Sequence, residues 1–187
     1  MKFFLYLFSA VIIAGFIVYE FGWYPVASVN GTLIFARAWQ RAINAERRVI
    51  NAHAFASHSR QIDFSSPKNA ELFGIVRKNM LTFLIDSEIM AKEGAAVVPD
   101  LGQLSIQRLN DELSKSKITE QTASAVYGLD VALLKEMVLL PQAQQEILSQ
   151  TLEADGKNFD DWLSGARGQA KVRFFFHSFQ WDQNGIK

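Results

Sequence analysis

One short stretch decides how the folded part of this chain is closed: VASVNGTLI, residues 26–34. It places Asn30 and Gly31 between two runs of apolar and β-branched residues. Asn-Gly is the strongest short-range signal for a tight β-hairpin turn, because both residues tolerate a positive φ. A lone hairpin is marginally stable in water, so it needs a partner strand from elsewhere in the chain.

The partner strand that the sequence offers is KVRFFFHSFQW, residues 171–181, which is rich in aromatic residues. We expect it to pair beside the hairpin. Alternation along such a strand divides its apolar side chains into two sets, namely Val172, Phe174 and Phe176 on one face and Phe175, Phe179 and Trp181 on the other. Either a helix covers each face, or an aromatic patch is left for a partner.

Between the hairpin and this strand, apolar residues recur at the helical spacing of three and four. The pattern predicts helices over residues 36–58, 70–93, 99–116, 119–127, 130–153 and 159–169. We expect Gly94 and Gly128 to end two of these helices and Asn158 to cap the last. Pro141 should kink the helix that contains it. The fold class is therefore mainly α, with a small β-sheet joining the N- and C-terminal ends of the region after residue 25.

The segment before the hairpin is directed to a membrane. The run FFLYLFSAVIIAGFIVY, residues 3–19, has no charge and no proline. As a helix it would reach roughly 25 Å, slightly short of the ~30 Å hydrocarbon core. Phe21, Trp23 and Tyr24 are therefore expected to complete the span at the interface.

The charges around this run predict its orientation. Lys2 precedes the run, whereas no Lys or Arg lies between Glu20 and Ala36. The positive-inside bias then places the N-terminus in the cytoplasm and the rest of the chain in the periplasm or outside the cell. We predict a single-pass anchor over residues 1–25 and an extracytoplasmic helical domain over residues 26–187. A cleaved signal peptide is the alternative, although its apolar core is usually shorter.

Composition excludes several classes of function. The chain has 187 residues, with 19 Lys+Arg against 19 Asp+Glu, so it has no net positive field for nucleic acid. It has no cysteine, which excludes disulfides, thiolate zinc sites and a cysteine nucleophile.

The remaining polar residues do not show the spacing of a catalytic centre. His53 and His58 would lie roughly 140° apart around a helix, a poor arrangement for sharing a metal. His177 has no nucleophile and base beside it in the sequence. The glycines of 165–168 lack the Gly-Lys-Ser/Thr that a phosphate loop requires. We therefore predict no enzyme activity, no cofactor and no metal.

Several motifs carry a family resemblance. VNGTLI, residues 29–34, is followed at once by a predicted long helix. MLTFLIDSEIMAKEG, residues 80–94, has the form LxxLIxxEIxxxEG and is followed by a proline and an acidic residue. YGLD, residues 127–130, precedes an apolar helix, and Lys-Val opens the aromatic strand at residue 171. Together these motifs resemble the N-terminal chaperone domain of the SurA type, shared by SurA-like and PpiD-like exported folding factors.

The chain departs from that family in two places. Phe35 and Ala36 stand where the family offers Ser or Thr to cap the first helix. Many relatives also carry a parvulin prolyl isomerase domain between the late helices and the closing strand, whereas here only a short stretch separates Leu152 from Gln169. The resemblance therefore does not imply proline isomerase activity.

The resemblance implies binding of unfolded polypeptides, which we call clients. Phenylalanine is frequent, at 15 residues, and methionine with aromatic side chains forms surfaces that adapt to varied partners. Core packing is the more common role of any one such residue. The candidate client contacts are Phe55, Phe64, Phe73, Phe83, Met90, Phe175, Phe179 and Trp181.

We thus expect a membrane-anchored extracytoplasmic chaperone-like protein that works without ATP and binds unfolded or newly exported polypeptides through apolar grooves. The alternative is a membrane-anchored interaction or assembly module for one specific protein partner. The sequence carries no signal for an oligomeric state.

Overall fold

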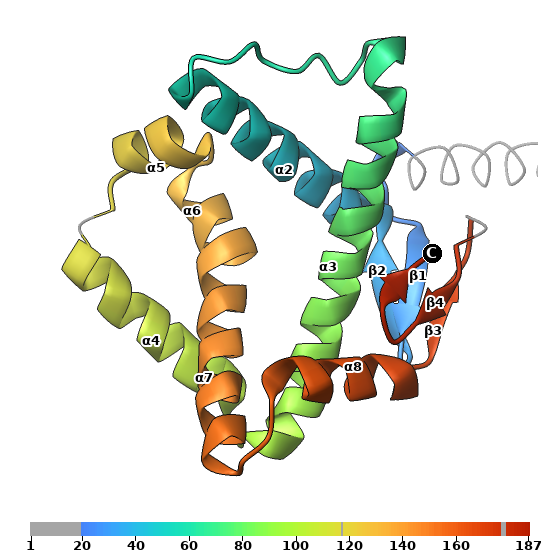
Figure 1. Cartoon of the computed structure of the whole chain (residues 1–187), viewed down its shortest axis with the longest axis vertical. Helices are drawn as coiled ribbons and strands as arrows, with labels where there is room; N and C mark the ends of the chain where they lie inside the picture. Colours follow the sequence, from blue (N-terminus) through green and yellow to red (C-terminus); the bar gives the residue numbers. More distant parts are fainter. Residues whose placement is uncertain (1–19, 117, 177–178) are drawn as a thin grey trace, which may run out of the picture.

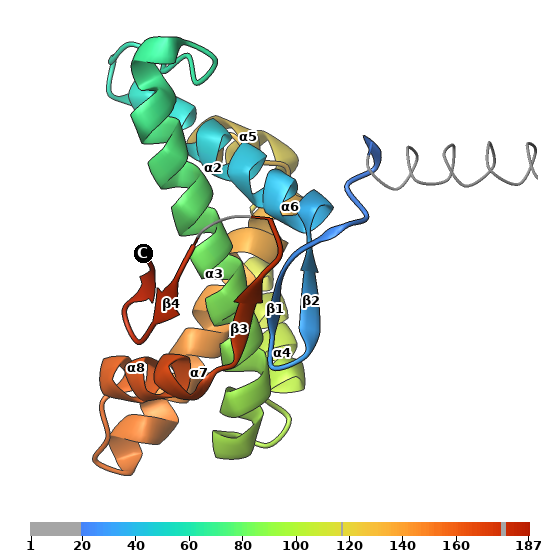
Figure 2. The same ribbon diagram turned by 90° about the vertical axis from the view of Figure 1, so that its right-hand side faces the viewer.

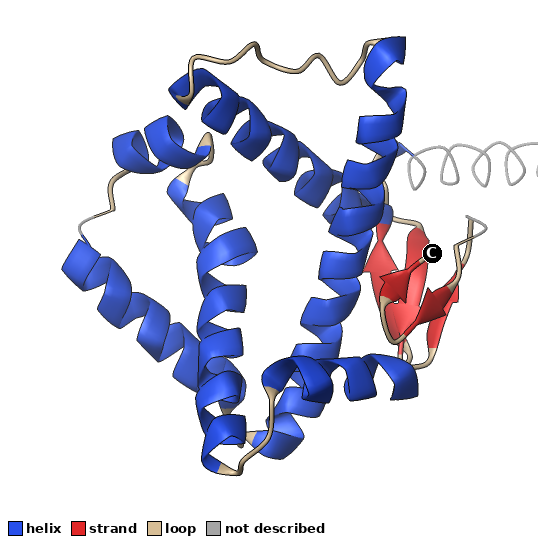
Figure 3. Ribbon diagram, viewed as in Figure 1, coloured by secondary structure: helices blue, strands red, loops and turns tan. Residues whose placement is uncertain are grey.

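The computed structural model describes residues 20–116, 118–176 and 179–187. This part of the chain is mainly helical and carries small antiparallel sheets on one side, as the sequence predicts (Figure 3). The apolar run at 3–19, and with it most of the predicted anchor, lies outside the described residues. Among the described helices, none is both long enough and apolar enough to cross a membrane.

The sheet closes the fold in the predicted way. Strands β1 (Pro25–Val29) and β2 (Thr32–Phe35) form an antiparallel hairpin, and β3 (Val172–Phe174) pairs antiparallel with the other edge of β1. Asn30 and Gly31 take φ values of 50° and 92°, the positive values that the hairpin turn demands. Figure 2 shows β1 between β2 and β3. The expected pairing of the C-terminal strand with the hairpin is therefore confirmed.

The expectation of one strand reaching Trp181 is wrong. The ladder with β1 ends at Phe174, and β4 (Trp181–Asp182) pairs with β5 (Gly185–Ile186) in a second hairpin. Phe174 and Phe179, expected on opposite faces, instead contact each other edge to face with centroids 5.6 Å apart. The second hairpin buries Ile186 in the core beside α3 (Ala70–Val97), which favours this arrangement.

The helices follow the predicted order. Asn158, Thr119 and Asp130 cap their helices by accepting hydrogen bonds from backbone N–H groups of the first turn. Phe35, as expected, caps the first helix with no side-chain bond. The other helical elements are α2 (Ala36–Ala56), η1 (Pro67–Asn69), α4 (Leu101–Ser116), α5 (Glu120–Tyr127), α6 (Val131–Leu134), η2 (Lys135–Leu139), α7 (Leu140–Ala154) and α8 (Phe159–Gln169).

Two helix breakers act differently from each other. Gly128 ends α5 in the left-handed conformation, as predicted. Gly94, however, does not end α3, which continues to Val97. A Cβ atom at position 94 would lie 2.8 Å from Leu101 Cδ2 and 3.0 Å from Leu148 Cδ1. The glycine thus permits α4 and α7 to approach α3 closely, which corrects the expectation of a helix end.

Pro141 disturbs its helix through the turn that precedes it. A proline has no N–H to donate, so the helix cannot keep its regular hydrogen bonds there. The preceding turn, η2, is a π-helix in which the Leu140 N–H donates to the Lys135 carbonyl. A widened π-helical turn, rather than one continuous α-helix, thus precedes Pro141 between α6 and α7, and the predicted kink itself stays a prediction.

Buried apolar residues of the described ranges form three clusters rather than one core. The first joins the sheet to α2 and α3, the second joins α2 to α5 and α6, and the third joins α3 to α4 and α7. Figure 1 shows α2, α3 and the α6–α7 helix along three sides of a triangle, and the clusters lie at its corners. Fully buried members of the three clusters are, in order, Ile43 and Ile85, Leu129 and Leu134, and Leu101 and Leu148.

Candidate functional site

An apolar cavity of about 140 Å³ lies inside the triangle of helices. Three elements line it, with Val49 from α2, Met80 and Phe83 from α3, and Met137 and Val138 from η2. These five side chains are partly exposed rather than buried. Val49, Met137 and Val138 also pack against the second cluster and Met80 packs against the first, so the cavity lies where these two clusters adjoin.

Glu46 brings a carboxyl group to this apolar wall. It lines the cavity together with Ala42 and Ala45 of the same helix. Burial raises the pKa of Glu46 above its ordinary value, and the nearby His53 lowers it to a smaller extent. A carboxyl group in such a place is disfavoured in its charged form, so protonation makes the wall more apolar.

A second hollow, of about 510 Å³, adjoins the cavity through a shared residue. Met137 lines both spaces. The other apolar walls of the hollow are Trp23, Phe35 and Leu84, the last of which follows Phe83 in α3. Met137 thus lies at the boundary of both spaces, and the hollow lies beside the N-terminal end of β1. We call these two spaces together the central site.

An ion pair links two helices at the wall of this hollow. Arg41 of α2 and Glu136 of η2 both line it, and their Nη2 and Oε2 atoms are 2.8 Å apart. Both side chains are about half exposed, so the pair contributes little to stability. It gives the apolar hollow one polar edge.

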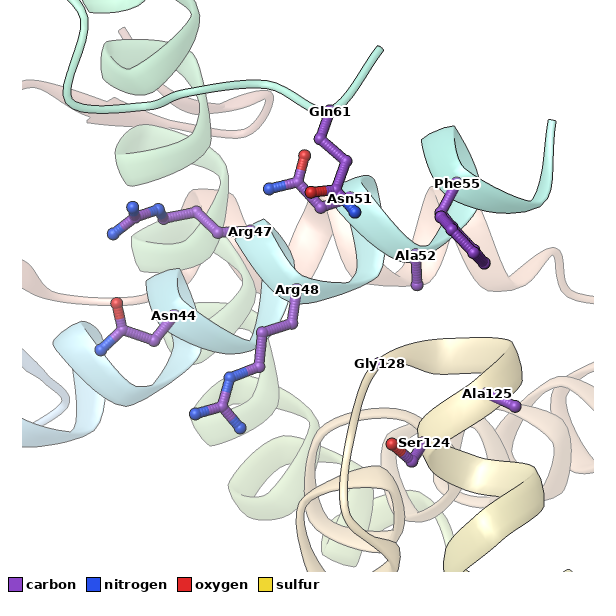
Figure 4. A pocket seen from close by; sticks show the side chains of 10 residues that line it. All are labelled: Asn44, Arg47, Arg48, Asn51, Ala52, Phe55, Gln61, Ser124, Ala125 and Gly128. Atoms are coloured by element: carbon purple, nitrogen blue, oxygen red, sulfur yellow. The ribbon is translucent and has the colours of Figure 1, made fainter. Parts of the chain in front are cut away.

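A third pocket, of about 640 Å³, is the largest of these three spaces and lies between α2, α5 and the loop after α2 (Figure 4). One end is polar, with Arg47 and Arg48, and the other is apolar, with Phe55. The guanidinium of Arg47 is already engaged, because it lies over the rings of Phe64 and Phe73 at 5.3 Å and 5.7 Å. Figure 4 shows both arginine side chains extending away from Phe55.

The structure separates the predicted contacts on α2 and α3. Phe83 lines the central site, and Phe55 is exposed at the edge of the third pocket. Phe73 is half-buried beneath the guanidinium of Arg47. Phe64 and Met90 belong to the buried clusters. Burial places these last two side chains out of reach of a partner in this conformation.

The C-terminal aromatic residues also differ among themselves. Phe175 is exposed and lies under the Arg173 guanidinium at 5.7 Å. Phe179 packs on Phe174, and Trp181 donates a hydrogen bond from Nε1 to the Arg167 carbonyl at 3.0 Å. Of these predicted contacts, only Phe175 presents much of its ring to solvent.

The prediction missed most of the central site. Met80 and Met137 showed the flexible methionine signal within apolar stripes, yet Val49, Leu84 and Val138 look like any other residue of a helical core. Which residues line the central site depends on how three helices cross. The apolar periodicity of a single helix contains no information about that crossing.

The site has no catalytic or metal-binding constellation among the residues that the structure describes. No group of three or more His, Asp or Glu residues gathers closely enough there to hold a metal ion. Comparisons with protein-family models, curated proteins and solved structures find no match to this chain. The functional interpretation therefore depends on the shape and chemistry of the central site.

Proposed function

We propose that this protein is a membrane-anchored extracytoplasmic chaperone-like protein that holds apolar segments of unfolded or newly exported polypeptides without ATP. The observation that carries the proposal is the central site, an apolar space lined by side chains from α2, α3 and η2. Met80, Phe83 and Met137 in its lining are partly exposed, so an apolar client side chain can contact them from outside the buried clusters.

The lining suits varied clients rather than one fixed ligand. Met80 and Met137 are unbranched and polarisable, so they adapt to apolar side chains of different shape. Burial of a client contributes about 25 cal/mol per Å² of apolar area, and the client's loss of conformational freedom opposes it. We expect weak and exchangeable binding of each segment.

Membrane attachment rests on the uncharged run at 3–19 and the charges around it. A tether raises the local concentration of the central site for polypeptides that emerge nearby. The resemblance to the SurA-type chaperone domain supports the same role. Proline isomerase activity is not part of the proposal, because the chain lacks a parvulin domain between α7 and β3.

The test is suppression of aggregation by the full chain in lipid nanodiscs. Several unrelated denatured proteins would be diluted into a molar excess of it, and light scattering would be followed. The matched variants are Met80→Gln with Met137→Gln, which keep side-chain length but add polar atoms to the central site. The control is Ile106→Gln, an exposed apolar residue on α4.

We expect the unmodified chain and the Ile106→Gln variant to suppress aggregation of several clients. The double methionine variant should lose most of this effect while keeping its circular dichroism spectrum. If a well-folded sample protects none of the clients, the chaperone proposal is overturned.

A second candidate is an assembly module for one specific protein. The largest of the three spaces favours it, because Arg48 and Gln61 line it with polar groups that a promiscuous holder does not need, whereas the Asn51 side chain already bonds the Ile62 backbone. Such a partner would form a saturable one-to-one complex in solubilised membranes. Arg48→Ala should weaken that complex, whereas the double methionine variant should not.

A further inference from the structure

The sheet brings three chain segments together at one edge. Strand β1 begins at Pro25, β2 ends at Phe35, and β3 ends at Phe174. Because β1 is antiparallel to both neighbours, these three ends lie together, as the pairing of Pro25 with Phe35 and of Ala27 with Phe174 shows. We call this the upper edge; in Figure 2 it is the upper end of β1, β2 and β3.

The upper edge carries a concentration of exposed aromatic rings. Tyr24, just before β1, meets the Phe176 ring edge to face at 5.5 Å, and the Phe175 N–H donates to the Val26 carbonyl. These contacts fix the segment after β3 beside the start of β1. The exposed rings and their exposed fractions are Phe21 64%, Trp23 62%, Phe35 41%, Phe175 40% and Phe176 63%.

Arginine side chains accompany these rings. Arg37 lies in the first turn of α2, where its backbone N–H donates to the Gly22 carbonyl at 3.0 Å. Arg173 lies over Phe175. Glu20 lines the same surface as Arg37. The summed charge of these three residues is positive. Exposed aromatic rings with arginine are typical of a membrane interface.

The opposite edge of the sheet is polar. It carries the Asn30-Gly31 turn, with Lys92 donating to the Asn30 carbonyl and exposed Lys171 beside it. The two edges are joined by the same short strands, so the contrast is a property of one small sheet.

We propose that the upper edge is a membrane-docking surface, with its aromatic rings in the interfacial region of a bilayer and Arg37 and Arg173 toward phospholipid phosphates. The occupant is a bilayer with anionic lipid. The inference rests on the anchor in the proposed function, because only Glu20 separates the uncharged run at 3–19 from Phe21. It does not depend on client binding.

Docking would fix the orientation of the domain. Trp23 and Phe35 line the outer hollow of the central site as well as the upper edge. The hollow would therefore open close to the membrane surface, where an exported chain emerges.

The test uses the full chain in vesicles of phosphatidylcholine and phosphatidylglycerol. The chain has no cysteine, so one introduced cysteine can carry a nitrobenzoxadiazole label. Phe176→Cys places the label at the upper edge, and Lys171→Cys places it at the opposite end of the same strand region. Ser9→Cys reports insertion of the 3–19 run by itself. Lipids spin-labelled near the headgroup and along the acyl chain quench labels that enter the bilayer.

We expect quenching of the labels at positions 9 and 176 and several-fold weaker quenching at position 171. Arg37→Gln with Arg173→Gln should reduce quenching at position 176 toward its value in phosphatidylcholine alone. If the label at position 9 is quenched but the labels at 176 and 171 are both quenched weakly and to the same extent, the anchor is supported and the docking proposal is overturned.

Two other outcomes also overturn the proposal. Lack of quenching at position 9 would remove both the anchor and the docking surface. The label at position 176 could instead be shielded from water without being quenched by the lipids. If this shielding increases with protein concentration, a second copy of the chain covers the upper edge. None of these results depends on aggregation suppression, so they are separate from the chaperone test.

Discussion

Asn30 and Lys171 lie 141 positions apart in the sequence and are joined by two hydrogen bonds. The Asn30 N–H donates to the Lys171 carbonyl at 3.0 Å, and the Lys171 N–H donates to Asn30 Oδ1 at 2.8 Å. Asn30 Nδ2 also donates to Glu93 Oε1 of α3 at 3.2 Å. One turn residue thus joins the hairpin, the closing strand and the longest described helix.

Asn30→Gly should destabilise the protein although glycine accepts the positive φ at this position. The variant loses the two side-chain hydrogen bonds, which together contribute roughly 2 kcal/mol. Urea unfolding followed by circular dichroism measures the change. A loss below about 0.5 kcal/mol would show that the side chain of Asn30 does not hold the closing strand.

Gly94→Ala and Gly74→Ala should have opposite effects although both residues lie in α3. Alanine at position 74 meets no atom within 4 Å, so better helix propensity should stabilise the protein by about 0.5–1 kcal/mol. Alanine at position 94 meets Leu101 and Leu148, which are buried and cannot swing away. Overpacking there should exceed the propensity gain and cost about 1 kcal/mol net. Thermal unfolding of the two variants side by side checks the difference in sign.

Arg167→Lys should weaken the attachment of α8 to α3. Arg167 Nε and Nη2 donate to the two carboxylate oxygens of Asp86 at 2.8 Å and 2.6 Å, a geometry that lysine cannot reproduce. We expect a loss of about 1–2 kcal/mol in the free energy of unfolding. The control is Arg108→Lys, whose pairs with Glu112 and Glu146 are more exposed and should cost under about 0.5 kcal/mol. Equal losses in the two variants would contradict a special role for the two-point pair.

Glu46→Gln should change how stability depends on pH. The pKa of Glu46 is raised in the folded protein, so the folded state binds its proton more readily than the unfolded state does. Stability is therefore highest below the ordinary value of 4.5 and falls as pH rises through the raised value. Removal of the charge should make the variant more stable than the parent at pH 7. The difference between their free energies of unfolding should decrease toward pH 4.

The measurement is urea unfolding of both proteins at intervals from pH 4 to pH 7. A constant difference across this range would contradict the raised pKa. The neighbouring His53 lowers the Glu46 pKa by a favourable charge interaction, so a His53→Gln background should enlarge the difference in stability between the two proteins. If Glu46 also faces bound clients, aggregation suppression should rise as pH falls in the parent and stay level in Glu46→Gln.

Local signals were sufficient where a few neighbouring residues decide the structure. The Asn30-Gly31 turn and the side-chain cap at Asn158 each depend on backbone angles and hydrogen bonds within three residues. The order of helices likewise follows from apolar periodicity. Pairing of β3 with the hairpin was predictable for a different reason, because an unpaired hairpin has no stable alternative.

Local signals failed where a distant neighbour decides the structure. The sequence around Gly94 predicts a helix end, but α3 continues past it. Leu101 and Leu148 pack so closely against Gly94 that a larger residue there would overpack the contact. The sequence after Lys171 predicts one strand to Trp181, but the ladder with β1 ends at Phe174 and a second hairpin buries Ile186 in the first cluster. In both cases the residues in contact lie far apart in the sequence, so a local pattern does not contain them.

The sequence by itself determined the turn, the caps, the helix order and the meeting of the two ends of the folded region, because each follows from bonds and angles within short segments or from one unsatisfied hairpin. Only the tertiary structure decided that Phe64 is buried, that Phe83 lines the central site and that Phe176 is exposed at the upper edge. Three phenylalanines with the same chemistry differ only in what the crossing helices and strands place against them. That information lies in long-range packing, which a one-dimensional pattern does not contain.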